Sequence, residues 1–120
     1  MLNRDVRDIM SVPWAMEMKS ISIEEPERLV ETLTGAIQGC GGWMLGRGGD
    51  HTGVVNIIFE FERQNCADIY CALMGSGLEL SPGGHATLTA LCQCTNRRQE
   101  SCGKEVASIE LEIQTFPCRR

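Results

Sequence analysis

The chain has no apolar run long enough to cross a membrane and no excess of positive charge. None of its 120 residues falls in a stretch near the roughly 18 apolar residues that a membrane span requires. Lys and Arg number 11 against 16 Asp and Glu, which gives a formal net charge of −5, so a basic surface for phosphates is not expected. We therefore expect neither a membrane nor a nucleic acid as a partner.

Signatures of catalysis and nucleotide binding are also missing. The sequence has no GxxxxGK[ST] phosphate loop, no nucleophile elbow, no zinc-protease helix and no paired-acid signature. The two histidines, His51 and His85, have no Ser, Cys or carboxylate placed beside them by spacing. The glycines between 39 and 53 follow a predicted helix and precede a strand, which favours a helix stop and a hairpin. We expect no cofactor and favour a protein that is not an enzyme.

Cysteine, by contrast, is plentiful, with seven in the chain. The charged beginning, MLNRDVRDIM, predicts no secretory signal, so reduced thiols in the cytoplasm are expected. An odd number of cysteines also suits a closed disulfide framework badly, and most are predicted to pack as small apolar groups. A metal or redox alternative stays open, with these candidate ligands: Cys92, Cys94, Cys102 and Cys118, with either His51 or His85.

Hydrophobic periodicity predicts two helices. Pro26 suits the first position of a helix, and apolar residues then recur at three- and four-residue spacing as far as Cys40. Gly41 and Gly42 are expected to end this helix, because glycine reaches the left-handed conformation at low cost. The same spacing predicts a second helix over 66–74.

Alternating apolar and polar residues predict five strands, at 14–24, 43–45, 53–63, 85–95 and 106–116. In the first of these, Met16 and Met18 fall on one face of the alternation. Ile21 and Ile23 fall on the other face, which predicts a bulge near Lys19 or a strand that begins late.

The resulting order, β-α-β-β-α-β-β, predicts a single α+β domain over 1–120, with a polar lead-in at 1–13 and a tail at 117–120. Two crossover helices feeding one sheet fit a ferredoxin-like plait, an antiparallel sheet with both helices on one face and an extra C-terminal strand. The other face would carry a mixed set of side chains that includes Val54, Ile58, Leu91, Val106 and Trp43. We expect a homodimer formed through that face or through a sheet edge.

The stretch Ile23-Glu24-Glu25-Pro26-Glu27-Arg28-Leu29 leads from the first predicted strand into the first predicted helix. With the element order over about 16–115, it resembles the ACT-type ligand-binding domains, which share the βαββαβ plait. ACT domains usually begin this helix after an Asp-x-Pro-Gly-type turn, whereas here Glu25-Pro26 is present and no glycine follows. The resemblance implies a dimer that binds a small effector between its subunits.

The candidate ligand-binding residues come from two nearby segments. Trp43, Arg47, Asp50 and His51 belong to the predicted hairpin, and Glu25 and Arg28 belong to the ACT-like turn. We expect a small non-catalytic cytoplasmic binding or regulatory module that acts as a homodimer and takes a small-molecule effector. Two alternatives stay open. One is a ferredoxin-like dimeric enzyme with His85 or His51 as acid/base, and the other is a cysteine-based metal or redox protein.

Overall fold

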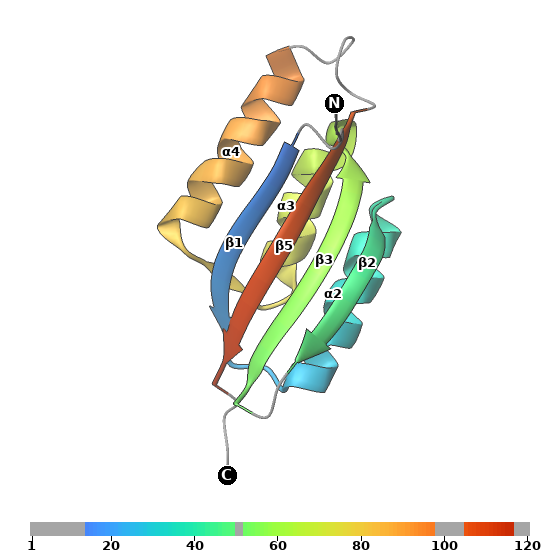
Figure 1. Cartoon of the computed structure of the whole chain (residues 1–120). Helices are drawn as coiled ribbons and strands as arrows, with labels where there is room; N and C mark the ends of the chain where they lie inside the picture. Colours follow the sequence, from blue (N-terminus) through green and yellow to red (C-terminus); the bar gives the residue numbers. More distant parts are fainter. Residues whose placement is uncertain (1–13, 50–51, 98–104, 117–120) are drawn as a thin grey trace, which may run out of the picture.

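Within residues 14–49, 52–97 and 105–116, which the computed structural model describes, five strands form one mixed sheet and three α-helices lie against one of its faces (Figure 1). The elements in chain order are β1 (Trp14–Ser22), α2 (Pro26–Gly39), β2 (Trp43–Gly49), β3 (Val54–Glu62), the 3-10 turn η1 (Arg63–Asn65), α3 (Cys66–Gly75), β4 (Glu79–Leu80), α4 (Pro82–Arg97) and β5 (Val106–Thr115). The α+β class predicted from the sequence is confirmed. Residues 1–13 and 117–120 lie outside the described residues.

The strand order is β2-β3-β5-β1-β4, which differs from the expected antiparallel plait. β5 pairs in parallel with β1 and antiparallel with β3, so it lies in the middle of the sheet and is not an extra C-terminal strand. A parallel pair needs a long crossover connection. Everything from α2 to α4 lies between β1 and β5 in the chain and supplies that connection. The sheet is therefore mixed, and the expectation of a purely antiparallel sheet is wrong.

Residues 85–95, expected to form a strand, belong instead to helix α4. Ser81 precedes the helix, and its Oγ accepts a hydrogen bond from the Gly84 N–H at 3.1 Å, as a capping residue does. Gly84, Leu88 and Leu91 are buried at the three- and four-residue spacing of one helical stripe. In the same segment, Ala86, Leu88, Ala90, Cys92 and Cys94 alternate with mostly threonine and glutamine, which mimics a strand. Leu91 thus packs in the helical layer, and the prediction that it lies on the sheet face away from the helices is wrong.

β1 begins at Trp14 and has a regular register with β5 along its whole length, so the expected bulge near Lys19 and the alternative of a strand that begins late are both wrong. Met18, Ser20 and Ser22 are buried on the side of the helices, while Ile21 is 44 % exposed on the other side. The two small serines occupy core positions that an alternation of apolar residues would assign to larger side chains. Because these two residues are polar, the alternation of apolar residues did not show which face of the strand is buried.

β2 extends to Gly49, into a stretch predicted as a turn. Its register with β3 shifts between Met44 and Gly46, a β-bulge that leaves Leu45 56 % exposed. Arg47 consequently pairs with Ile57 within a strand and does not lie at a hairpin tip. Asp50 and His51 lie outside the described residues.

The core lies between the sheet and the helices. α2 contributes Leu29, Leu33 and Ile37, all fully buried. It ends at Gly39, and Gly41, just beyond the C-cap Cys40, has the left-handed φ of +89° that the predicted helix stop requires. The other buried apolar side chains come from four of the strands (β1, β3, β4 and β5), from α3 and α4, and from the connection before β4; they include Val55, Ile57, Phe59, Phe61, Ile69, Leu73, Leu88, Ile109, Leu111 and Ile113. One face of the sheet is therefore packed, and within the described residues no helix lies on the other.

Candidate functional site

A hollow of about 520 Å³ lies between the first half of α2 and the end of β2. It is lined by Pro26, Glu27, Val30, Glu31, Arg47, Gly48, Gly49 and Val55, and we call it the α2–β2 hollow. Pro26 begins the helix at this place, and the glycines keep the strand free of bulky side chains. At Gly48 an added Cβ would meet no atom within 4 Å, so the strand leaves open space beside the helix.

Charges of both signs line the α2–β2 hollow. The Arg47 side chain reaches towards α2, where its Nη1 donates to the Thr34 Oγ1 at 3.5 Å. Glu27 and Glu31 lie on the helix side of the hollow. A guanidinium binds a carboxylate with several aligned N–H groups, and carboxylates accept hydrogen bonds from an ammonium group. With the apolar Val30 in the lining, the hollow suits a small molecule that carries both charges.

Three of the six predicted ligand residues lie at this end of the molecule. Arg47 lines the α2–β2 hollow itself. Glu25 and Arg28 line an adjoining hollow of about 670 Å³, which shares Pro26, Glu27 and Glu31 with the first one.

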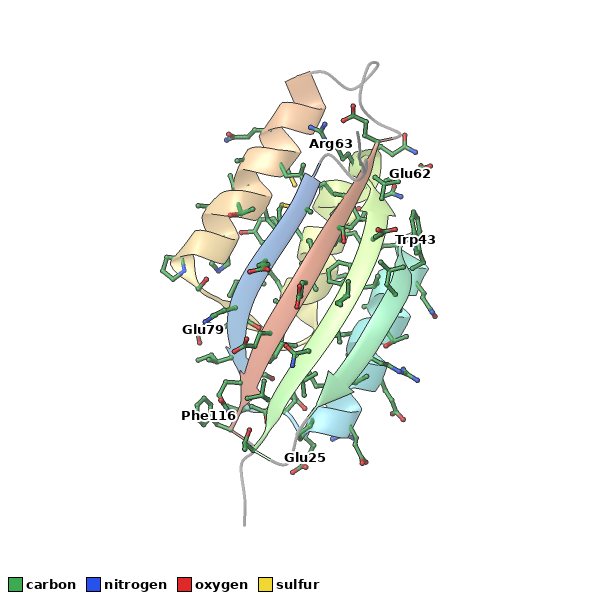
Figure 2. The ribbon with its side chains drawn as sticks, viewed as in Figure 1. Glu25, Trp43, Glu62, Arg63, Glu79 and Phe116 are labelled. Carbon is green, nitrogen blue, oxygen red and sulfur yellow. The ribbon has the colours of Figure 1, made fainter. Side chains whose placement is uncertain are left out.

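Trp43 lies elsewhere. Figure 2 shows it at the opposite end of the molecule from Glu25. Its partner in the register, Glu60, lies on the sheet face that bears no helix, and the indole Nε1 donates to the Glu60 Oε1 at 3.0 Å. The expectation that Trp43 shares a site with Glu25 and Arg47 is therefore wrong. The bulge pairs Trp43 with Glu60, on the sheet face that bears no helix, and Arg47 with the buried Ile57, on the side of the helices.

The sheet face without helices, which we call the uncovered face, is rich in acid. The side chains that alternate with the core positions of the three central strands include Glu17, Lys19, Ile21, Asn56, Ile58, Glu60, Glu62, Glu110 and Glu112. Glu17 lies directly beside Glu110 in the register, and a small hollow of about 210 Å³ there is lined by these and neighbouring residues. Like charges directly opposite on neighbouring strands are unfavourable, so this surface attracts positive groups.

A second group of polar side chains lies where α3 packs against α4, a region we call the α3–α4 seam. Cys66 Sγ and Cys92 Sγ are 2.7 Å apart. One helical turn along α3, the Tyr70 hydroxyl and the His85 Nδ1 are hydrogen bonded at 2.6 Å, and their rings are in contact. His85, expected as a possible acid/base, thus has a tyrosine partner, and the hollows described above are lined by other residues.

Cys66 and Cys92 differ in how far solvent reaches them. Cys66 is 2 % exposed, and its burial raises the pKa of the thiol well above the ordinary value. The hydrogen bond and the charge of Cys92 raise that pKa further, while the Arg63 guanidinium acts in the opposite direction. Cys92 is only partly buried. The Cys66 sulfur is therefore held as a thiol, whereas Cys92 is the less buried residue of the pair.

Sequence reasoning missed this pair because it placed Cys92 on a strand. As a strand residue it shares a face with Cys94, but on α4 it faces α3. Cys102 and Cys118 lie outside the described residues, as does the side chain of Cys94. Among the side chains that the structure does describe, no group of three or more His, Cys, Asp or Glu is placed to hold a metal ion. A correct helix assignment for 82–97 is the signal that would have pointed to Cys66.

In the parts of the chain that the structure describes, no helix combines the length and the apolar composition that a membrane crossing requires.

Comparisons with known proteins give no match. A scan against protein-family models, a search of curated proteins and a search of solved structures each find nothing similar to the chain. The ACT-type resemblance therefore stays a prediction.

Proposed function

We propose that the protein is a non-catalytic cytoplasmic binding or regulatory module that takes a small amino-acid-like molecule in the α2–β2 hollow. The observation that carries this proposal is that Arg47, Glu27 and Glu31 line one hollow of about 520 Å³ together with apolar side chains. Small-molecule sites are typically concave and largely apolar, with a few polar groups that fix the orientation of the ligand. Here Arg47 binds the carboxylate of the ligand and the glutamates bind its amine.

The position of the α2–β2 hollow supports the same function. Pro26 and Glu27 belong to the turn that resembles the ACT-type domains, and both line the hollow. That resemblance implies an effector site between two subunits. The hollow is also lined by Gly48 and Gly49 of β2, and β2 forms one edge of the sheet. A ligand at this place is therefore close to any second chain that pairs with β2.

A ligand screen tests the binding proposal. We expect one or more free amino acids to raise the thermal unfolding temperature, because a ligand at 100 times its Kd stabilises the folded state by about 2.7 kcal/mol. Arg47→Gln is expected to remove this shift. Lys19→Gln, which neutralises a cation on the uncovered face, serves as the matched control and should retain it. A shift that survives in Arg47→Gln, or no shift with any amino acid, contradicts the proposal.

We also propose that two copies pair along β2. The uncovered face is a poor surface for self-association, because a two-fold axis would bring its glutamates against their own copies. β2 is the longer of the two edge strands, with seven residues against two in β4. Edge strands present backbone N–H and C=O groups that a second strand can pair with. The exposed Leu45 adds apolar surface at this edge.

Light scattering coupled to size exclusion tests this pairing. The protein is expected to elute with twice the mass of one chain, and Leu45→Lys is expected to shift it to the monomer mass, because it places a charge at the β2 edge. The matched control is Ile23→Lys, at a residue that is 66 % exposed just beyond β1. That variant should remain dimeric. A monomeric mass for the unchanged protein at micromolar concentration would overturn the pairing.

A further inference from the structure

The α3–α4 seam brings two cysteine sulfur atoms into direct contact. Cys66 Sγ and Cys92 Sγ lie 2.7 Å apart although their residues are 26 positions apart in the chain. Both belong to regular helices, Cys66 at the first position of α3 and Cys92 in the second half of α4. Rigid elements therefore hold the pair, and joining the sulfur atoms needs little movement of either backbone.

The pair is also chemically asymmetric. Cys92 is partly exposed, while Cys66 is 2 % exposed and its Sγ also lies 3.9 Å from the Leu88 carbonyl oxygen. The attacking species in thiol chemistry is the thiolate, which forms where solvent and reagents have access. Cys92 is thus placed to react first, and Cys66 is placed behind it to react second.

We propose that Cys66 and Cys92 form a reactive dithiol that undergoes thiol–disulfide exchange with low-molecular-weight disulfides. In the first step the Cys92 thiolate attacks one sulfur of the reagent RSSR, the S–S bond of the reagent breaks, and one RS⁻ leaves and takes up the proton of Cys92. In the second step the Cys66 Sγ attacks the Cys92 Sγ, the bond between Cys92 and the reagent breaks, and the proton of Cys66 passes to the departing sulfur, which leaves as the second RSH. Two protein thiols are oxidised to one disulfide, and RSSR is reduced to two RSH.

This dithiol is distinct from the proposed binding function. It lies in the α3–α4 seam, whereas the α2–β2 hollow is lined by residues of α2, β2 and β3. A disulfide there would join α3 to α4 covalently on the helical layer and leave the hollow unchanged. Failure of either proposal therefore says nothing against the other.

Peptide mapping of the full chain by mass spectrometry tests the proposal. The protein is treated with oxidised glutathione, alkylated and digested without reduction. We expect a peptide pair linked between Cys66 and Cys92, lighter by two hydrogens than the separate peptides and released by dithiothreitol. The far-ultraviolet circular dichroism should not change, because the sulfur atoms are adjacent before they are joined. A folded protein that carries glutathione on Cys92 without the link, or that shows neither thiol reacting, overturns the proposal.

Two substitutions test the order of the steps. In Cys66→Ala the second thiol is missing, so we expect glutathione to accumulate on Cys92 as a stable mixed disulfide. In Cys92→Ser we expect Cys66 to stay unmodified, since reagents do not reach it. Cys71→Ser removes an exposed thiol of the same helix and is the control, with the Cys66–Cys92 link retained. Glutathione found on Cys66 of folded Cys92→Ser would contradict the proposed order, and the map of the unchanged chain decides the link even where a variant fails to fold.

Discussion

Replacing Phe59 with alanine is expected to lower the free energy of unfolding by about 3–5 kcal/mol. Phe59 is fully buried in β3, and its ring stacks on that of Phe61 with centroids 6.1 Å apart. Its register partners are Met44 on one side and Ile109 on the other, so the ring lies well inside the sheet. The loss combines the transfer free energy of the aromatic ring with the cost of the cavity that it leaves. Urea denaturation followed by circular dichroism measures it as a lower midpoint with an unchanged slope.

Phe116 provides a matched control for this prediction. It follows β5 and is 59 % exposed, although its backbone N–H donates to the Ser22 carbonyl oxygen at 2.7 Å. Phe116→Ala removes the same ring and leaves that hydrogen bond, so a change within about 0.5 kcal/mol is expected, as is usual for surface positions. Equal losses for the two substitutions would show that the packed layer does not lie on the Phe59 side of the sheet.

Ala90→Pro is expected to destabilise the protein by about 3 kcal/mol or more. Ala90 is exposed in the middle of α4. Proline there removes a backbone hydrogen bond, and its ring meets the carbonyl of the residue four positions earlier, at Ala86. The loss is measured by urea denaturation, and the helical signal at 222 nm should fall as well.

Ala90→Lys tests whether residues 85–95 form the helix seen in the structure or the strand that their alternation predicts. In a strand with that alternation, Ala90 faces the core and lysine would be strongly unfavourable. On α4 the side chain is exposed, and lysine is a good helix former, so a change within about 0.5 kcal/mol is expected. A loss from lysine as large as that from proline would contradict the helix.

The sequence predicted a helix or strand correctly where its hydrophobic pattern fitted only one of the two. Helix α2 has Pro26 at its beginning, a stripe of buried residues and Gly41 at its end, and each of these features acts over a few residues. The core side of β3 and β5 followed from strict alternation in the same way. Residues 85–95 fitted both the three- to four-residue spacing of a helix and the two-residue alternation of a strand. The capping contact of Ser81 with Gly84 is a stronger signal for the helix than the alternation is for a strand.

Part of the candidate site could also be predicted. The ACT-like turn pointed to Glu25 and Arg28, and the structure places both beside the α2–β2 hollow, which Arg47 lines directly. Glu27 and Glu31, which line the same hollow, were not among the residues predicted from the sequence. Their place beside Arg47 depends on β2 lying beside α2, which no local pattern specifies.

The sequence by itself determined the α+β class, the course of α2 and α3, and the core side of the two longest alternating strands, because these depend on interactions between residues close in the chain. Only the tertiary structure decided that β5 enters between β1 and β3, that Arg47 and Glu31 line one hollow, and that the Cys66 and Cys92 sulfur atoms lie side by side. Such pairings join residues far apart in the chain, and the choice among them depends on the burial summed over the whole sheet. That sum is a property of the complete fold, so no short stretch of the sequence is enough to evaluate it.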